Sequence, residues 1–152
     1  MSIDTALFVK VDPDAVLPGK AHSDDVGLDV TVIRFHSRLT STTVMYDTGL
    51  RMRAPPGMHA ELIARSSLVK HGLALANAVG VIDPGYTGNL LVALTKTDPH
   101  MPDPVLPLRC CQLVFRRTLP VRAAQVERFD TTTDISERGI GGFGSTDAVP
   151  RL

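Results

Sequence analysis

The segment ARSSLVK (64–70) gathers groups that hold phosphate. An Arg followed by two Ser at a predicted helix start places a guanidinium, two hydroxyls and free backbone N–H groups together. Arg65, Ser66 and Ser67 are therefore candidate ligands of a phosphorylated molecule. The same pattern is also typical of an ordinary Ser cap at the start of a helix, and the segment alone leaves both interpretations open.

The segment GVIDPGYTG (80–88) predicts a hairpin turn at Asp-Pro-Gly. Gly80 lets a ligand approach the backbone closely. Asp83 and Tyr86 are the polar and aromatic candidates of this segment. Taken alone, each is more simply structural, Asp83 as a turn residue bonded to its own backbone and Tyr86 as a half-buried strand aromatic.

The segment ERGIGGFGST (137–146) matches the dinucleotide fingerprint G-x-G-x-x-G at Gly139, Gly141 and Gly144. That fingerprint must follow a strand and open a helix, and only eight residues follow Gly144, so we reject the match. What remains is a flexible loop with a cation, an aromatic ring and hydroxyls. Such a loop suits a cover that stacks on a base and reaches for phosphates; its candidate residues are Arg138, Phe143, Ser145 and Thr146.

Two further segments carry weaker signals. Asp29 in DDVGLDV (24–30) could serve a metal ion, and Gln112 in RCCQLVF (109–115) could bond a ligand, although structural roles are the simpler interpretation of both. The five His residues are scattered without the spacing of zinc ligands, so we expect no zinc site.

Short runs rich in Val, Ile, Leu and Thr, separated by Pro, Gly and Asp, predict an all-β sandwich, jelly roll or barrel. One short helix is expected over 65–72, capped by Ser66 or Ser67 and ended by Gly72. The predicted strands are Thr5–Val11, Leu28–Phe35, Thr42–Met52, His59–Ala64, Leu73–Val81, Asn89–Thr97, Cys110–Thr118 and Gln125–Phe129.

We expect one β-domain over 1–130 and a flexible, Gly-rich C-terminal arm over 131–152. The arm is too polar to fold alone. It is either a frayed terminus or a segment that becomes ordered on a ligand or a neighbouring subunit.

Composition excludes several classes of protein. The 152 residues include 16 basic and 16 acidic side chains, so no net charge favours nucleic acid or an anionic membrane. The adjacent Cys110 and Cys111 do not readily bridge. The start of the chain has no signal-peptide pattern, and no run approaches the ~20 apolar residues of a membrane span. We expect an intracellular protein, cytoplasmic or nuclear.

In order and spacing, these five segments resemble the five motifs of the trimeric dUTPase family. The resemblance runs from Leu17 to Asp147, and the third and fifth motifs are the most specific. Val30 replaces the usual Leu. The fourth motif usually reads Lys-Gly-x-Arg-Ile-Ala-Gln, whereas residues 106–112 here read LPLRCCQ, so we expect a different turn before the retained Gln112.

The resemblance implies Mg²⁺-dependent hydrolysis of dUTP to dUMP and pyrophosphate, which keeps uracil out of DNA and supplies dUMP for thymidylate synthesis. It implies catalytic roles for Asp83, Gln112 and Arg138, with Asp83 holding the 3′-OH and positioning the attacking water. Asp29 would meet Mg²⁺ through water. Substrate contacts would come from Arg65, Ser66, Ser67, Asn77, Gly80, Ile82, Asp83, Tyr86, Gln112, Arg138, Phe143, Gly144, Ser145 and Thr146.

The resemblance also implies a homotrimer with shared active sites. The first, second and fourth motifs would come from one chain, the third from a second and the fifth from the last.

Two alternatives remain at this point. The first is dCTP deaminase, which shares the fold and whose catalytic Glu would correspond to Ala93 here. The second is a non-catalytic dUTPase-like module that binds proteins, in which one or more motifs decay.

Overall fold

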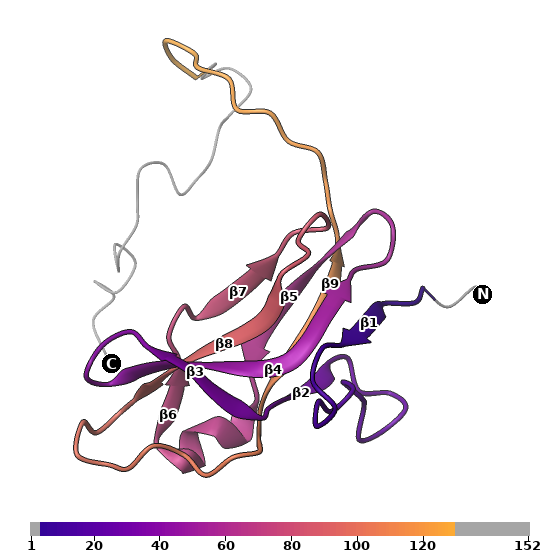
Figure 1. Cartoon of the computed structure of the whole chain (residues 1–152). Coiled ribbons are helices and arrows are strands. Elements are labelled where there is room, and N and C mark those ends of the chain that lie inside the picture. Colours follow the sequence, from indigo (N-terminus) through magenta and orange to yellow (C-terminus); the bar gives the residue numbers. More distant parts are fainter. Residues whose placement is uncertain (1–3, 130–152) are drawn as a thin grey trace, which may run out of the picture. The chain divides into compact units, whose positions relative to one another are not determined.

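The computed structural model describes residues 4–129 of the chain. Within them, nine strands and one short 3-10 helix form an almost entirely β structure (Figure 1). The elements are β1 (Leu7–Lys10), β2 (Leu28–Val32), β3 (Arg34–Arg38), β4 (Thr43–Arg53), β5 (Met58–Ala64), η1 (Ser66–His71), β6 (Leu73–Leu75), β7 (Val79–Ile82), β8 (Asn89–Lys96) and β9 (Leu108–Arg117).

Two antiparallel sheets enclose the core, which confirms the predicted all-β jelly-roll class. One sheet has the order β1-β4-β8-β6, with β3 also paired to β4. The other has the order β2-β9-β5-β7. In Figure 1, β7, β5 and β9 lie side by side, and β4 and β8 belong to the facing sheet. Every strand pair is antiparallel.

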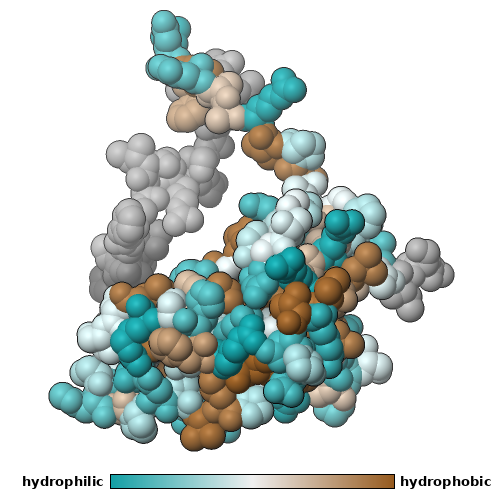
Figure 2. Space-filling model, viewed as in Figure 1, coloured by the Kyte–Doolittle hydropathy of each residue, from teal (hydrophilic) through white to brown (hydrophobic). Residues whose placement is uncertain are grey.

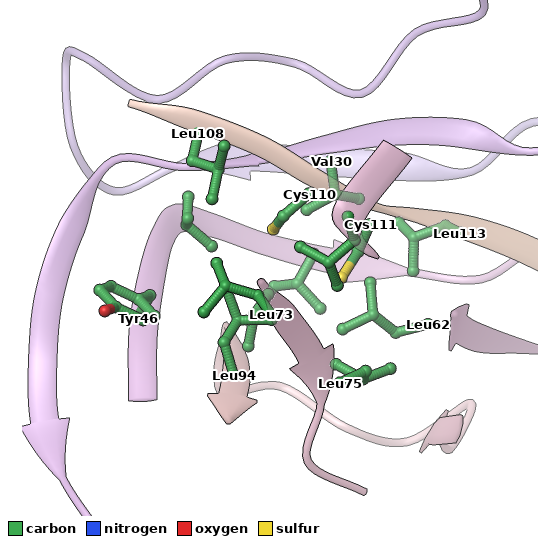
Figure 3. Packing of buried hydrophobic residues seen from close by; sticks show 14 of the residues in the cluster. Val30, Tyr46, Leu62, Leu73, Leu75, Leu94, Leu108, Cys110, Cys111 and Leu113 are labelled. Atoms are coloured by element: carbon green, nitrogen blue, oxygen red, sulfur yellow. The ribbon is translucent and has the colours of Figure 1, made fainter. Parts of the chain in front are cut away.

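The core forms because the strands alternate apolar and polar residues with a period of two. In β8, Leu90, Val92 and Leu94 are buried while the residues between them are partly exposed. Figure 3 shows side chains from both sheets, among them Tyr46 and Leu113, pointing into one cluster. Outside the core, apolar side chains lie among polar ones on the visible face (Figure 2).

Two predicted strands are each divided in the structure. The predicted strand 28–35 becomes β2 and β3, because the chain leaves one sheet after Val32 and enters the other at Arg34. The predicted strand 73–81 becomes β6 and β7 around a turn in which Ala78 has a φ of 57°. An apolar pattern cannot show which sheet a strand joins, and no Gly or Pro marks this turn.

The short helix follows its prediction at one end only. Gly72, with a φ of 63°, ends η1 as expected. The prediction that Ser66 or Ser67 caps its start is wrong: Arg65 occupies the cap position, and no side-chain hydrogen bond caps the helix. The hydroxyls of Ser66 and Ser67 therefore do not cap the helix.

The chain divides into two compact units, Met1–Leu119 and Pro120–Leu152. Residues 120–129, the described part of the second unit, contain no helix or strand, so the predicted strand Gln125–Phe129 is wrong. The predicted arm 131–152 lies outside the described residues. In the part that the structure describes, no helix has the length and apolar character needed to cross a membrane.

Candidate functional site

Most of the predicted site residues within 4–129 line two separate cavities of the first unit. The hairpin pocket, of about 230 Å³, lies between β7 and β8 and is lined by Met45, Leu62, Asn77, Gly80, Val81, Ile82, Asp83, Tyr86, Asn89, Leu90, Leu91 and Ala93. The arginine pocket, of about 240 Å³, is lined by Ala21, Asp25, Val26, Gly27, Asp29, Arg65, Ser66 and Gln112.

The hairpin pocket contains all the candidates of the third segment together with Asn77. A side chain at Gly80 would place its Cβ 3.3 Å from Asn77 Nδ2 and 3.4 Å from Leu62 Cβ. Glycine therefore keeps the backbone of β7 open beside the Asn77 amide. Backbone and amide groups that converge on a small, partly apolar cavity can read the polar edge of a flat ring.

Asp83 presents an exposed carboxylate at the mouth of this pocket. A backbone bond closes the turn, with Tyr86 N donating to Asp83 O at 3.0 Å. Across residues 4–129, the Asp83 carboxylate itself has no hydrogen-bond or ion-pair partner. The interpretation of Asp83 as a side chain bonded to its own turn therefore finds no support.

Tyr86 lies in the loop before β8 rather than in a strand, and its side chain is 43% exposed. Its hydroxyl donates to the backbone oxygen of Asn89 at 2.8 Å. This bond ties the ring, which forms part of the pocket lining, to the start of β8.

The arginine pocket is built around the Asp29 carboxylate. Arg65 Nε lies 2.8 Å from Asp29 Oδ1, and Arg109 Nη1 lies 3.5 Å from Asp29 Oδ2. Arg65 Nη1 lies 3.5 Å from Ser67 Oγ, so Ser67 supports Arg65 while Ser66 lines the pocket. The Arg65 guanidinium, the Ser66 hydroxyl and the Gln112 amide give the pocket a donor-rich lining that suits phosphate oxygens, and the Arg109 guanidinium lies beside Asp29.

A β-bulge in β9 brings two side chains of the fourth segment, RCCQLVF (109–115), to the face that carries Asp29. The register between β2 and β9 shifts so that Val30 pairs with Cys111 but Thr31 pairs with Arg109. Cys110 is the extra residue, and both cysteines are buried and free (Figure 3). The shift reverses the alternation of side chains, so Arg109 and Gln112 both face outward beside Asp29.

The two pockets lie on opposite sides of the same sheet. Leu62 and Leu113 pair across β5 and β9 and are both buried, so their side chains point into the core. Gly80 pairs with Leu62 and shares that side. Gln112 directly precedes Leu113 and points outward. One chain therefore does not bring the two sets of residues to a single small ligand.

Asp25 and Asp29 supply the carboxylates of the arginine pocket. Among residues 4–129, no group of three or more His, Cys, Asp or Glu side chains could enclose a metal ion. The donor set fits Mg²⁺ in its usual mode, in which the ion keeps several waters and meets one or two carboxylates together with substrate phosphates.

Gly27 and Asn89 are two residues of the site that the sequence motifs did not predict. A Cβ at Gly27 would lie 2.2 Å from Gln112 Oε1 and 3.0 Å from Gln112 Cβ. Asn89 lines the hairpin pocket and is bonded to Tyr86 through its backbone oxygen. Gly27 lies within the segment DDVGLDV (24–30), but its role, which is to leave space for the Gln112 side chain, appears only in the structure. The predicted residues Arg138, Phe143, Gly144, Ser145 and Thr146 lie outside the described residues.

Comparisons with known proteins agree on one family. A sequence model of the family described as dUTPase matches residues 14–147. The deoxyuridine 5'-triphosphate nucleotidohydrolase of Thermobifida fusca is 40% identical over 139 residues, covering 90% of this chain and 75% of that protein. The protein of the same name from Clostridium acetobutylicum is 32% identical over 138 residues, covering 90% and 92%.

Solved structures resemble the fold. A mutant dUTPase of Staphylococcus bacteriophage 80alpha with dUpNHpp superimposes with a TM-score of 0.76 at 23% identity, covering 95% of this chain and 99% of that one. The dUTPase of phage phi11 of S. aureus superimposes with a TM-score of 0.67 at 20% identity, covering 84% and 99%.

Proposed function

The chain belongs to the dUTPase family and hydrolyses dUTP to dUMP and pyrophosphate, and we propose that it does so in a site assembled from the hairpin pocket of one subunit and the arginine pocket of another. The observation that carries this proposal is the placement of the two pockets on opposite sides of the sheet β2-β9-β5-β7.

The hairpin pocket holds the deoxyuridine in this proposal. The open backbone at Gly80 and Ile82 and the amide of Asn77 pair with the polar edge of uracil. Tyr86 packs beneath the deoxyribose, where a 2′-hydroxyl would collide with the ring. A site that buries such polar groups rejects other bases because it would leave those groups unpaired.

The arginine pocket holds the phosphates. Arg65, Ser66 and Gln112 are its donors, and Ser67 orients Arg65. In-line attack of water at phosphorus needs positioning and charge neutralisation more than covalent help. The free Asp83 carboxylate orients the water and accepts its proton. Arg138, Phe143, Gly144, Ser145 and Thr146 of the fifth motif are proposed to cover the bound nucleotide.

Mg²⁺ is the proposed cofactor, and Asp29 would hold the ion through water beside the substrate phosphates. When bound, the ion neutralises charge on the phosphates. The Asp29 carboxylate already faces Arg65 and Arg109, so an indirect contact is the one that leaves both ion pairs intact. A dUTPase of phage phi11 has been described with a structural Mg(II) ion, which is a property of that protein.

The lining of the hairpin pocket disfavours deamination of dCTP. Ala93, the position that would carry the catalytic Glu of a deaminase, lines the hairpin pocket with a methyl group. Among the described residues of that lining, Asp83 is the only carboxylate.

Substrate comparison tests the proposal. The value of kcat/KM is measured for dUTP, dTTP, dCTP and UTP, with pyrophosphate release as the readout. We expect strong preference for dUTP. Comparable turnover of dCTP or UTP would overturn the assignment of the hairpin pocket, and absence of pyrophosphate release would instead favour the non-catalytic module.

A further inference from the structure

The Tyr86 ring occupies a position that two neighbouring residues define. Its hydroxyl reaches past Gly88 to the backbone oxygen of Asn89, 2.8 Å away. An aromatic side chain in an exposed turn could otherwise occupy several rotamers. The single bond to Asn89 selects one of them.

Gly88 provides the space for this arrangement. A Cβ at position 88 would lie 2.4 Å from the Tyr86 hydroxyl, 2.7 Å from Cζ and 3.1 Å from Cε2. The backbone of Gly88 does not lie in the left-handed region, so the position requires glycine for space and not for conformation. No larger residue fits unless the ring moves.

Asn89 is itself fixed from two directions. Its Nδ2 donates to Asp47 Oδ2 at 3.3 Å, and its Oδ1 accepts from Arg51 Nε at 3.1 Å. Asp47 is 2% exposed and also accepts from the amide of Gly49 at 2.7 Å. The backbone oxygen that accepts the tyrosine bond therefore belongs to a residue of β8 whose side chain is hydrogen-bonded to the buried Asp47 of β4.

We infer that Gly88 and Asn89 are positioning residues that set discrimination between deoxyribonucleotides and ribonucleotides by fixing the Tyr86 ring. This rests on the proposed contact of Tyr86 with the deoxyribose. Without the space at Gly88 or the anchored oxygen of Asn89, the ring leaves the position in which a 2′-hydroxyl would collide with it.

The test compares Gly88→Ala with Gly85→Ala. Apart from its two chain neighbours, a Cβ at Gly85 meets nothing within 4 Å, so that variant adds the same methyl group to the same turn. We expect Gly88→Ala to lower the ratio of kcat/KM for dUTP to that for UTP by about tenfold, the usual scale of one lost steric or hydrogen-bond contact. Gly85→Ala should keep the wild-type ratio. Equal ratios in Gly88→Ala and wild type would overturn the inference.

Measurements in a Tyr86→Ala background distinguish an error in the inferred role of Gly88 from an error in the proposed role of Tyr86. With the ring removed, discrimination should fall, and adding Gly88→Ala should change it no further. An equally large additional effect would show that Gly88 acts elsewhere and would overturn the inference. Full discrimination in Tyr86→Ala would instead contradict the proposed role of Tyr86.

A structural readout does not depend on activity. Nuclear Overhauser effects between the Tyr86 ring and the Gly88 α-protons are expected in the wild-type protein. Ring contacts to residue 88 should weaken in Gly88→Ala, while the signals of the buried Tyr46 ring stay unchanged. Absence of the wild-type contacts would count against the proposed ring position.

Discussion

Asp83 differs from Asp29, the other carboxylate with a proposed role, because no ion pair neutralises it within residues 4–129. Asp29 faces two arginines, whereas Asp83 is exposed and, within residues 4–129, unpartnered. A carboxylate held in this way keeps its capacity to accept a hydrogen bond from water. The residue is therefore the one on which the proposed chemistry depends.

We predict that Asp83→Asn lowers kcat by roughly 10²–10⁴-fold, the usual range for a positioned acid–base group. Asn is nearly isosteric and tolerates turns as well as Asp does, so the fold and dUTP binding should persist. Steady-state kinetics with dUTP, together with binding of a non-hydrolysable analogue, measure both properties. Turnover close to wild type would restore the interpretation of Asp83 as a turn residue.

A second residue-scale prediction concerns Gly27. Because its missing side chain makes room for both Cβ and Oε1 of Gln112, Gly27→Ala must shift that side chain. We expect kcat/KM for dUTP to fall by about tenfold, as for the loss of one charge-assisted contact. Gly19→Ala is the matched control, because a Cβ there meets nothing within 4 Å. Equal kinetics of the two variants would show that Gln112 does not need its present position.

The candidate site could be identified from the sequence where residue type and spacing carry the signal. Arg65, Asp83 and Tyr86 could be named because the order and spacing of their segments resemble those of a known family, although each segment alone leaves a structural role open. Gly27 and Asn89 were missed because their roles depend on which side chain lies opposite, and that follows from strand register. The bulge at Cys110 is a third case, since alternation alone assigns Arg109 and Gln112 to opposite faces.

At the scale of elements, the turn between β6 and β7 stores backbone strain next to the hairpin pocket. Ala78 adopts a φ of 57°, which disfavours any residue with a Cβ. We predict that Ala78→Gly raises the free energy of unfolding by about 0.5–1 kcal/mol. Urea denaturation of both proteins at equal concentration measures the change. A less stable Ala78→Gly protein would mean that the lost conformational entropy of glycine exceeds the strain.

The buried Asp47 in β4 links stability to pH. Burial raises the pKa of Asp47. The hydrogen bonds from the Gly49 amide and from Arg34 lower it by more, so the pKa of Asp47 lies below its usual value. A carboxyl with a depressed pKa stabilises the fold above its unfolded pKa, about 3.9, and that contribution is lost as the pH falls through the folded pKa. We predict a steeper loss of stability below about pH 4 in wild type than in Asp47→Asn. Parallel curves would contradict this.

The strands were largely predictable because they are rich in apolar and β-branched residues, which alternate with partly exposed residues in β5 and β8. The errors have a common cause. The chain changes sheet at Ile33 and again between Leu75 and Val79, and neither change alters the apolar pattern. Gln125–Phe129 has the composition of a strand but does not form one in the described residues. In all three segments, the formation of a strand depends on the strand with which it pairs, and the local sequence does not specify that partner.

At the scale of the whole molecule, the two proposed halves of the site lie on opposite sides of one sheet of a single chain. Asp83 belongs to one half and Arg65 to the other. A closed cyclic assembly can unite the two pockets in one site, because each subunit then presents its hairpin pocket to one neighbour and its arginine pocket to the other. We propose a homotrimer on this basis, in agreement with the resemblance of the five motifs.

Mixed trimers test this arrangement with lesions in the two halves. Asp83→Asn and Arg65→Ala are each expected to be nearly inactive, and are denatured together and refolded in equal amounts. With random assembly, about three in four trimers are mixed, and each mixed trimer has one site in three with both halves intact, so roughly one quarter of wild-type activity should return. The matched control mixes Arg65→Ala with Gln112→Ala. Both lesions then lie in the same half, every site keeps one of them, and almost no activity should return. Recovery near zero for the first pair, with mixed trimers shown by mass spectrometry, would contradict the shared site, because it would place Asp83 and Arg65 of each site in the same chain.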